Sequence, residues 1–485
     1  MLSFNRKILI IGYGSVSQCA LPILFQQIEI PYERVTVIDF VDQRNSLKEW
    51  INKGVHYFQE KITPETLDNI LSKYVEPGGA VIDLAWNIDC IEMLRWCHDH
   101  QVLYLNTSVE EWNPFEDIHN KTPLRKSLYW RQMCIRELIA SWGSGQSSVT
   151  AVVDHGANPG LISHFTKQGI VDIAEKSLKD NLVSPEKIKH IENGLETLDF
   201  ARLAMNLDIK VIHCSERDQQ ITDHPKKVDE FVGTWSIEGL IEEGMAPAEM
   251  GWGTHEKKLP EYACVPEYGP KNQIFLPQMG MNTWVRSWVP SQEIIGMVIR
   301  HGEAFGISDK LTVWEKEKAV YRPTVHYAYM PCHETLASLY ELRGRGYRPQ
   351  PEQRIMSDEI TEGEDILGAL IMGHPYQSWW TGSILSINES RKLIPHQNAT
   401  TVQVAIGVIS AFMWMIENPK KGFCLPDDLP HDFILKIAKP YLGQFVSQDY
   451  NWTPETNYQV FFKENPKNVF DKDNLWAFEN FLFRG

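Results

Sequence analysis

The chain has 485 residues, of which 43% are hydrophobic and 23% are charged, and its formal net charge is −16. This composition excludes a disordered chain, a collagen-like repeat and a small disulfide-dense scaffold. The length allows about three domains of roughly 150 residues. A chain this acidic lacks the positive face that binding to nucleic acid requires, so nucleic acid is not an expected partner.

The first 153 residues alternate short apolar runs with stretches of helical periodicity. The apolar runs predict strands at residues 7–12, 34–40, 55–59, 79–85, 102–106 and 148–153, with helices between them that include 64–73, 88–97 and 123–140. This alternation predicts βαβ units and a parallel sheet. We therefore predict an α/β protein in which residues 1–153 form an NAD-binding Rossmann domain, a doubly wound parallel sheet.

A glycine loop joins the first predicted strand to the first helix. Gly12 permits a tight turn, and Gly14, Ser15 and Val16 begin a helix whose free N–H groups can bind a pyrophosphate. Ser17 replaces the third glycine of the usual motif, which weakens the pattern without removing it. The alternative is a Rossmann-like domain that binds no nicotinamide cofactor.

The carboxyl ends of the other predicted strands supply further cofactor candidates. Asp39 ends the second strand, where a carboxylate can bind the ribose hydroxyls and repel a 2′-phosphate, so we expect NAD rather than NADP. Ligands of open α/β sheets bind in the crevice beyond these strand ends. The remaining candidates at this edge are Asp83, Ala85, Asn87, Thr107 and Ser108. Each could equally be an ordinary turn or helix cap.

A turn-rich segment, DHGANPGL at residues 154–161, leaves the last predicted strand. Its Gly, Asn and Pro content is typical of turns, and the simplest interpretation is a junction between domains. Because it follows a strand end, the segment also adds Asp154, Ala157, Asn158 and Pro159 to the residues expected beside a bound nicotinamide.

The rest of the chain predicts a second α+β domain with a mixed sheet at residues 154–400. Strands are expected at 209–213, 233–236, 292–300, 311–321 and 324–329, and a surface loop at 341–356. Residues 401–485 are expected to form a helix at 401–417, packing back on the Rossmann domain, and a tail without clear periodicity after 448. The apolar run in that helix is shorter than the ~20 residues of a membrane span, so no membrane association is expected.

The eight cysteines are scattered and include no Cys-x-x-Cys pair. Neither a disulfide framework nor a structural zinc site is therefore expected, and no metal is predicted. Reduced thiols and an N-terminal apolar run too short for a signal peptide favour a cytoplasmic protein.

Five segments of the chain resemble bacterial homospermidine synthases, which are relatives of saccharopine dehydrogenase. These segments are GYGSV at 12–16, DHGANPGL at 154–161, CSERD at 214–218, NAT at 398–400 and PYLG at 440–443. The resemblance implies an enzyme that converts two putrescines into homospermidine and ammonia through imines. NAD is then recycled internally, so the aminoalkyl transfer is redox-neutral. The resemblance also implies a homodimer built through the second domain.

The same resemblance assigns roles to individual residues. Glu216 and Glu243 would bind ammonium groups or act as acid/base groups, and Trp235 would hold a cationic centre on its ring face. His301 would carry a proton near neutral pH, and Asn158 would contact the substrate. Without the resemblance, a lone tryptophan is more often core, a lone glutamate is usually a solvated charge, and a histidine beside an arginine is often structural.

Two carboxylates of the first domain complete the predicted substrate site. Asp89 and Glu110 follow strand ends and are expected to face the same cleft as the residues of the second domain. Glu111 is adjacent to Glu110 in the sequence, and the two could exchange roles.

Two other functions remain open from the sequence. A saccharopine-type or carboxynorspermidine-type dehydrogenase acts on amino acid imines and needs an arginine to bind a carboxylate, for which Arg217 and Arg286 are available. The chain could also be a non-catalytic polyamine-binding protein that responds to NAD.

Overall fold

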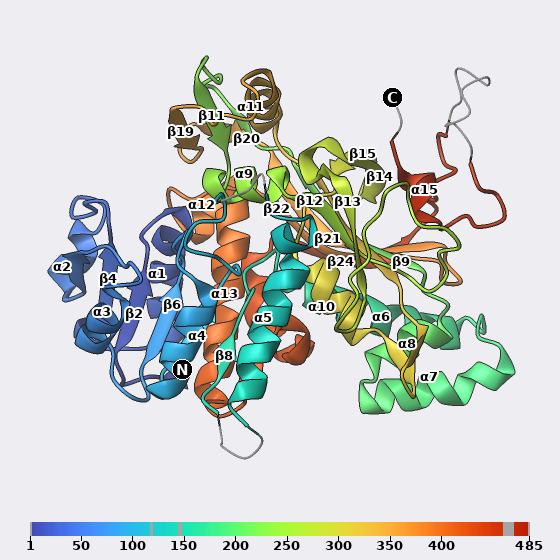
Figure 1. Cartoon of the computed structure of the whole chain (residues 1–485), viewed down its shortest axis with the longest axis horizontal. Coiled ribbons are helices and arrows are strands. Elements are labelled where there is room, and N and C mark those ends of the chain that lie inside the picture. Colours follow the sequence, from blue (N-terminus) through green and yellow to red (C-terminus); the bar gives the residue numbers. More distant parts are fainter. Residues whose placement is uncertain (1, 117–119, 144–147, 459–469, 484–485) are drawn as a thin grey trace.

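The computed structural model describes residues 2–116, 120–143, 148–458 and 470–483. Figure 1 shows two units side by side: a smaller sheet built from the N-terminal residues, in blue, and a larger sheet built from later residues. Helix α13 (Ala399–Glu417) stands between them. The fold therefore brings a C-terminal helix into the middle of the molecule.

The first sheet is the predicted Rossmann sheet. Its strands are β2 (Ile8–Ile11), β4 (Val35–Asp39), β5 (His56–Gln59), β6 (Ala80–Asp83), β7 (Leu103–Asn106), β8 (Ala151–Val152) and β23 (Phe423–Cys424). They lie in the order β23-β8-β7-β6-β2-β4-β5, and every pair is parallel. Without β23 this is the 3-2-1-4-5-6 order of dinucleotide-binding domains, so the predicted fold class is confirmed. Strand β23 comes from the C-terminal segment and was not predicted.

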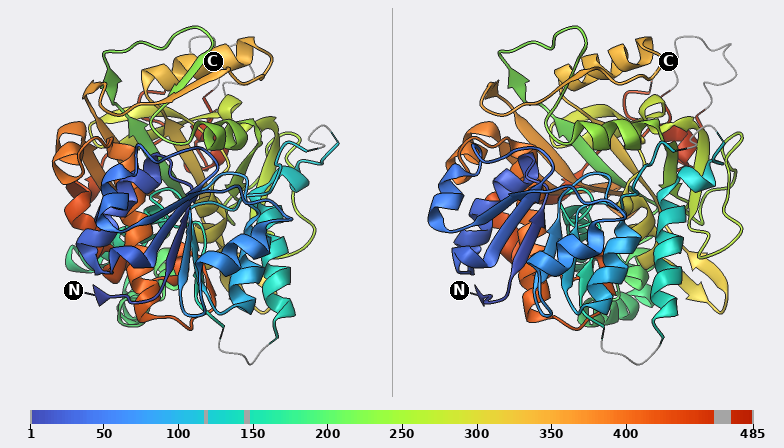
Figure 2. Two further views of the ribbon diagram at one scale, coloured as in Figure 1. Left: turned by 90° about the vertical axis from the view of Figure 1, so that its left-hand side faces the viewer. Right: turned by 60° about the vertical axis from the view of Figure 1, so that its left-hand side comes forward.

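Strand β2 shows why this sheet is covered on both faces. All four of its residues are buried. Ile8 and Ile10 belong to one apolar cluster, whereas Leu9 and Ile11 belong to another. Since side chains alternate along a strand, a continuous apolar run is what a parallel strand between two helical layers requires. The helices of these layers are α1 (Ser15–Gln27) and α13 on one side and α3 (Leu67–Tyr74), α4 (Cys90–Asp99) and α5 (Leu128–Ser141) on the other (Figure 2).

The second sheet is mixed, as predicted. Its strands are β9 (Val211–Asp218), β12 (Pro247–Gly251), β13 (Gln273–Met279), β14 (Trp284–Val289), β15 (Gln292–Met297), β18 (Thr324–Met330), β21 (Glu364–Met372), β22 (Ser378–Ser386) and β24 (Gln444–Tyr450). Their main order is β13-β12-β18-β9-β21-β22-β24, and the β14–β15 hairpin joins through β18. Only the β9–β18 pair is parallel among these described strands.

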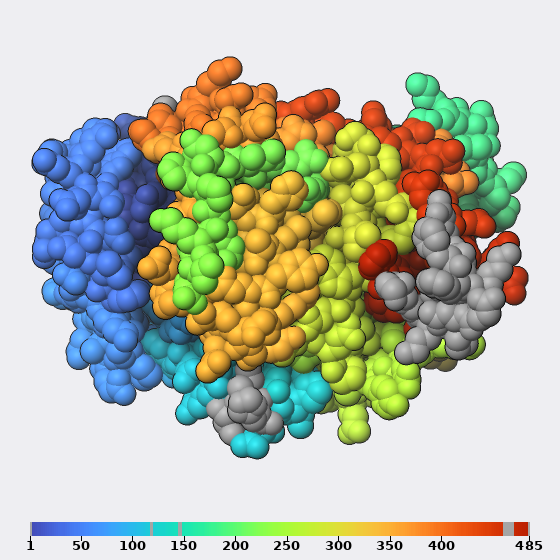
Figure 3. Space-filling view, turned by 90° about the horizontal axis from the view of Figure 1, so that it is seen from above, coloured from blue at the N-terminus to red at the C-terminus, as the bar shows by residue number. Residues whose placement is uncertain are grey.

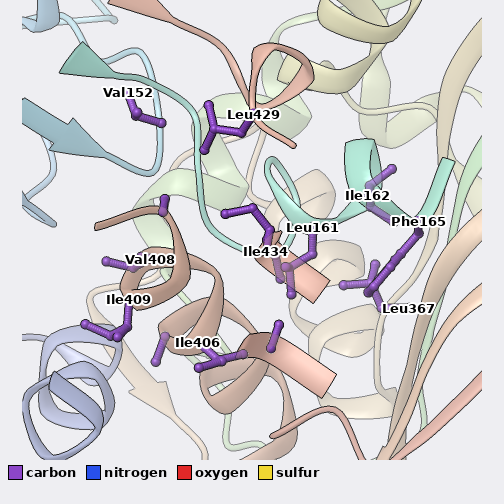
Figure 4. Close-up of a cluster of buried hydrophobic side chains, with 14 of the residues drawn as sticks. Val152, Leu161, Ile162, Phe165, Leu367, Ile406, Val408, Ile409, Leu429 and Ile434 are labelled. Atoms are coloured by element: carbon purple, nitrogen blue, oxygen red, sulfur yellow. The ribbon is translucent and has the colours of Figure 1, made fainter. Parts of the chain in front are cut away.

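The two units share one continuous core. Helices α6 (Leu161–Lys179) and α10 (Gly302–Lys310) pack on one face of the second sheet, and α13 packs on α1. Figure 4 shows side chains of this cluster, with Val152 from the first sheet, Phe165 from α6, Leu367 from the second sheet and Ile406 from α13. Because α13 touches both units, it fixes their relative position.

Several smaller elements complete the fold. The helices are α2 (Lys48–Lys53), α7 (Pro185–Thr197), α8 (Phe200–Asn206), α9 (Ile237–Met245), α11 (His333–Gly344), α12 (Ile387–Leu393), α14 (His431–Ala438) and α15 (Phe478–Phe481). The 3-10 turns are η1 (Tyr32–Arg34), η2 (Leu124–Lys126), η3 (Gly280–Asn282), η4 (Pro426–Asp428) and η5 (Lys439–Tyr441). The short strands are β1 (Leu2–Ser3), β3 (Ile28–Glu29), β10 (Ile221–Thr222), β11 (Glu230–Gly233), β16 (Val313–Glu315), β17 (Lys318–Tyr321), β19 (Glu352–Ile355) and β20 (Ile360–Glu362).

A layer made by β11, β19, α9 and α11 covers the middle of the molecule, beside the blue N-terminal unit (Figure 3). Two predictions failed in this layer. The strand expected at 233–236 ends at Gly233, because the Ser236 side chain caps α9 by accepting a hydrogen bond from the Gly239 N–H. The loop expected at 341–356 contains the end of α11 and strand β19 instead.

Three further differences concern element boundaries. The helix expected at 123–140 begins only at Leu128, where Ser127 caps it. The strand expected at 311–321 is the β16–β17 hairpin. In the predicted tail, β24 pairs with β22 and α15 packs on β14, while residues 459–469 lie outside the described residues. The domain boundaries at 153/154 and 400/401 stay predictions.

Candidate functional site

A cavity of about 140 Å³ lies between the two units, beyond the carboxyl ends of β6 and β7. It is built from loops of the first sheet, the 154–161 junction, β9, α9, α10, β18, β21 and α13. It brings together most of the residues predicted from the sequence, which are Val16, Ala85, Thr107, Ser108, Glu110, Ala157, Asn158, Pro159, Glu216, Trp235, Glu243 and His301.

The glycine loop leaves the N-terminus of α1 open. Gly12 has a φ of +83°, and a Cβ there would lie 3.1 Å from the backbone of Ala85, so the tight turn needs glycine. A Cβ on Gly14 would meet nothing within 4 Å, and no side chain caps α1. Ser17 replaces the third glycine and donates a 2.6 Å hydrogen bond to the Gly12 carbonyl, which holds the turn. Open space at an uncapped helix N-terminus fits a dinucleotide pyrophosphate.

Asp39 lies at the end of β4, next to this loop. Its carboxylate accepts hydrogen bonds from the backbone N–H groups of Tyr13 (2.7 Å) and Val41 (2.8 Å). Ser15 is the first residue of α1, and Val16 lines the cavity. This geometry holds one carboxylate at the sheet edge where a ribose of a bound dinucleotide would lie.

Besides Gly12, Gly14, Ser15 and Asp39, four predicted residues do not line the cavity. Asp83 is buried below it and accepts hydrogen bonds from the Ala85 N–H and the Tyr104 hydroxyl. Asp89 caps α4 by accepting from the Glu92 N–H at 3.0 Å. The other two are Asn87, in a left-handed turn with φ +64°, and Asp154, whose buried carboxylate accepts from Gln132. The carboxylates of Asp83, Asp89 and Asp154 thus accept hydrogen bonds from neighbouring residues, whereas the buried Asn87 Oδ1 has no partner among the described residues.

Glu110 and Glu111 differ in their surroundings. Glu110 lines the cavity, accepts a 2.7 Å hydrogen bond from the Ser108 hydroxyl and leaves its buried Oε2 without a partner among the described residues. Glu111 instead pairs with Arg131 at 3.3 Å. Burial and the nearby Glu242 raise the pKa of Glu110 to about 7. Glu110 is therefore the carboxylate that faces the cavity.

Glu216 extends from β9 into the cavity and is 4% exposed. It accepts hydrogen bonds from the Asn158 side-chain amide at 2.9 Å and from the Tyr327 hydroxyl. Burial raises its pKa to about 7, although these two hydrogen bonds oppose the shift. A carboxyl group with this pKa can exchange a proton near neutral pH.

His301 stands between two carboxylates. Its Nδ1 lies 2.7 Å from Glu303 Oε2, and its Nε2 lies 3.7 Å from Glu243 Oε2. Burial alone would lower the pKa of His301, but Glu303 and Glu243 outweigh it and raise the pKa to about 9. Burial raises the pKa of Glu243 to about 8 despite His301. Glu303 also accepts the Gly160 N–H at 3.1 Å, which ties His301 to the junction loop.

An aromatic wall joins Trp235 to His301. The Trp235 Nε1–H donates a 3.1 Å hydrogen bond to the Tyr329 hydroxyl. The rings of Tyr329 and Tyr327 stack at 5.3 Å, and Tyr327 meets the His301 ring edge-on at 4.7 Å. Both Trp235 and Tyr327 line the cavity. A cation inside the cavity would lie against aromatic rings as well as carboxylates.

Several residues of this site were not predicted from the sequence, and four of them carry polar groups that bear on its chemistry. Asp365 on β21 has no exposed surface, accepts a 2.6 Å hydrogen bond from the Thr400 hydroxyl and leaves Oδ1 without a partner among the described residues. The others are Tyr327, Glu303 and Gln403. No local motif marks Asp365, because only the pairing of β21 with β9 brings it near Glu216.

The lining of the cavity suits a cationic ligand. It includes Glu110, Glu216, Glu243 and Asp365, but no arginine or lysine from the part of the chain that the structure describes. The two arginines considered from the sequence are engaged elsewhere: Arg217 donates to the Pro331 carbonyl, and Arg286 pairs with Glu293. Buried carboxylates with raised pKa values are stabilised by a positive charge placed among them.

Within the described residues, no group of three or more His, Cys, Asp or Glu side chains has a geometry suited to a metal ion. One described helix, α13, is long and apolar enough to span a membrane, but 83% of its most apolar window is buried inside the protein. All eight cysteines are free.

Comparison with known proteins gives consistent results over the whole chain. The family model for the saccharopine dehydrogenase NADP binding domain matches residues 8–152, and that for the saccharopine dehydrogenase C-terminal domain matches residues 156–449. The homospermidine synthase of Blastochloris viridis is 37% identical, covering 99% of this chain and 98% of that protein. The homospermidine synthase of Mesorhizobium japonicum is 35% identical, with coverage of 98% and 96%.

A solved structure extends this similarity to three dimensions. The crystal structure of homospermidine synthase from Legionella pneumophila in complex with NAD matches with a TM-score of 0.87. It is 36% identical in sequence, and the match covers 100% of this chain and 99% of that one.

Proposed function

This chain belongs to the homospermidine synthase family, and on this premise we propose that it converts two putrescine molecules into homospermidine and ammonia, with NAD recycled during each turnover. The observation that carries the proposal is the cavity itself. It places four carboxylates and a tryptophan, with no arginine or lysine among the described lining residues, beyond the edge of a Rossmann sheet.

The nucleotide half of the site fits NAD. The open N-terminus of α1 would bind the pyrophosphate, and Asp39 would accept hydrogen bonds from a ribose. The nicotinamide would lie near Thr107, Asn158 and Pro159. When bound, NAD supplies reversible oxidation of the carbon that bears the substrate amine.

The other half of the site would hold the diamine. Glu216 and Glu243 would bind its ammonium groups, and Trp235 would present a ring face to the positive charge of a substrate imine. Glu110, which also lines the cavity, would bind another ammonium group. These contacts would hold the flexible diamine in one orientation. Its reacting amine would then approach the nicotinamide in a defined geometry.

Proton transfer falls to the groups whose pKa values lie near neutrality. An amine must lose a proton before it attacks an imine carbon, and departing ammonia must gain one. Glu216, with a pKa near 7, would accept and return protons, and Asn158 and Tyr327 would orient it. His301 would be cationic below about pH 9 and would exchange protons with Glu243.

Turnover of putrescine tests this function. Purified protein incubated with putrescine and a catalytic amount of NAD should form homospermidine and ammonia in equal amounts, with no net NADH. Accumulation of NADH in proportion to product, or a requirement for a keto acid, would instead favour a dehydrogenase of amino acid imines.

The two alternative functions find less support. A dehydrogenase of amino acid imines needs an arginine to bind the substrate carboxylate, and both Arg217 and Arg286 are held away from the cavity. A pure polyamine-binding protein does not need a histidine between two carboxylates beside the substrate.

We also propose that the enzyme works in the cytoplasm as a homodimer joined through its second domain. The free cysteines are in keeping with a reducing compartment. The oligomeric state follows from the resemblance to the family.

A further inference from the structure

Behind the cavity lies a buried cluster of three charged side chains, which we call the ion triad: Arg131, Glu242 and Arg300. Their side chains are 6%, 6% and 3% exposed. Arg131 Nη2 lies 2.6 Å from Glu242 Oε1, and Arg300 donates to the same oxygen. Burial would raise the pKa of Glu242, but Arg300 and Arg131 outweigh it and lower the pKa to about 2, so Glu242 remains ionised.

Two cavity groups directly follow members of the ion triad in the sequence, and a third lies between two residues that the triad contacts. Glu242 directly precedes Glu243 on α9, and Arg300 directly precedes His301. Arg131 donates a 2.6 Å hydrogen bond to the Val109 carbonyl and contacts Glu111, so it holds the residues on both sides of Glu110.

We propose that the ion triad positions Glu110, Glu243 and His301 in the cavity. Its charges also set the electrostatic potential at the two glutamates. Its members are therefore positioning residues for diamine binding. The inference rests on the proposed function for the identity of the ligand. Removing one partner of a buried ion pair leaves the other charge uncompensated, which gives the triad a large influence on its surroundings.

The ion triad contains both negative and positive charges next to Glu243 and Glu110. Removing a negative charge and removing a positive charge should therefore shift the pKa values of these two glutamates in opposite directions. Glu243 faces His301, Glu242, Arg300 and Glu110, and among these Glu242 raises its pKa while Arg300 lowers it. Glu110 faces Glu242, Arg131 and Arg300 with the same signs. Loss of the Glu242 charge should therefore lower both pKa values, whereas loss of the Arg300 charge should raise them.

The test measures putrescine affinity of the NAD-loaded enzyme by calorimetry between pH 6 and 9. In Glu242→Gln, the pH below which affinity is lost should move down by about one unit. In Arg300→Met, it should move up by a similar amount. Glu242→Asp keeps the charge but shortens the side chain, so its pH profile should stay in place while kcat falls by about 10- to 100-fold.

Glu293→Gln is the matched control, because Glu293 forms a comparable partly buried pair with Arg286 outside the cavity lining. It should leave the affinity and its pH profile unchanged. Should Glu242→Gln fail to fold, Arg300→Met and Glu242→Asp carry the test alone. The inference would be overturned if the pH profile of putrescine affinity stayed in place in folded Arg300→Met. It would also be overturned if the profile moved in the same direction in Glu242→Gln and Arg300→Met.

The binding measurement also separates this inference from the proposed function. Wild-type enzyme that binds putrescine but forms no homospermidine would contradict the function. Opposite shifts of the binding profile in the variants would still support the role of the ion triad.

Discussion

The two halves of the cavity are built by different means. The nucleotide half uses backbone and small side chains: an uncapped helix N-terminus, two glycines and one carboxylate at a strand end. The diamine half uses buried ionisable side chains, with Glu216, Glu243 and His301 coming from three separate elements. The backbone N–H groups of the nucleotide half bind a ligand without gaining or losing a proton. The diamine half instead holds side chains with pKa values between about 7 and 9.

This difference predicts that changes in the two halves affect different quantities. Changes in the nucleotide half should alter NAD affinity and leave the pH dependence in place. Changes in the diamine half should alter turnover and its pH dependence and leave NAD affinity in place.

The largest effect is expected for Glu216→Gln. The amide cannot accept a proton, so kcat should fall by about 100- to 10,000-fold, while NAD affinity stays within about twofold. Steady-state kinetics and NAD titration measure the two quantities. The control is Glu238→Gln on α9, which lies outside the cavity lining and should keep normal activity. A kcat above one-tenth of normal in the Glu216 variant would contradict its assigned role.

A valine at position 14 tests the nucleotide half. Gly14 has φ −76° and open space above it, so Gly14→Val should fold normally but reduce NAD affinity at least tenfold, or about 1.4 kcal/mol. Gly12→Val should instead lower thermal stability, because Gly12 has a positive φ and lies close to Ala85. Thermal unfolding and NAD titration separate the two; unchanged NAD affinity in folded Gly14→Val would place the pyrophosphate elsewhere.

The pH dependence of kcat/KM should be bell-shaped. Ionisation of Glu216 and Glu243, with pKa values of about 7 and 8, should raise kcat/KM by up to about tenfold per pH unit between pH 7 and 8 and by up to about 100-fold per pH unit below pH 7. Loss of the His301 proton near pH 9 should lower it on the alkaline side. His301→Gln should remove the alkaline limb and move the acid limb to higher pH, because the His301 charge lowers the pKa values of Glu243 and Glu216. A flat profile between pH 6 and 8 would exclude the glutamates as ionised ligands.

A smaller effect is expected for Trp235→Phe. Phenylalanine keeps a ring face but is a weaker cation acceptor and loses the hydrogen bond to Tyr329, so kcat should fall by about 2- to 30-fold. The kcat of Trp235→Leu should fall further than that of Trp235→Phe. NAD affinity should not change in either variant. Equal activities of the phenylalanine and leucine variants would show that the ring contributes only volume.

The smallest effect is expected for Asp89→Ala. Since Asp89 caps α4 and does not line the cavity, its loss should cost about 1 kcal/mol of stability and leave the KM for putrescine unchanged. Chemical unfolding and steady-state kinetics measure the two effects. A tenfold rise in KM would restore the substrate-binding role expected from the sequence.

The same contrast explains how much could be predicted. The Rossmann strands and the glycine loop follow from periodicity and glycine spacing, which are local properties. Glu216, Glu243 and Trp235 came from family resemblance, since a single glutamate or tryptophan carries no local signal. Asp365 and Glu303 were missed because the pairing of β21 with β9 and the contact of α10 with the junction loop are properties of packing. Strand β23 was missed for the same reason, because it joins the first sheet from the far end of the chain.

The fate of deuterium during turnover tests most directly whether diamine and NAD react within this one cavity. The substrate is putrescine deuterated on both carbons that bear nitrogen, supplied to enzyme already loaded with NAD, together with free unlabelled NADH. If NAD stays bound while both substrate molecules react, the homospermidine should keep every deuterium atom of its two parent molecules, as mass spectrometry would show. Product that has exchanged one deuterium for hydrogen from the added NADH would contradict the account.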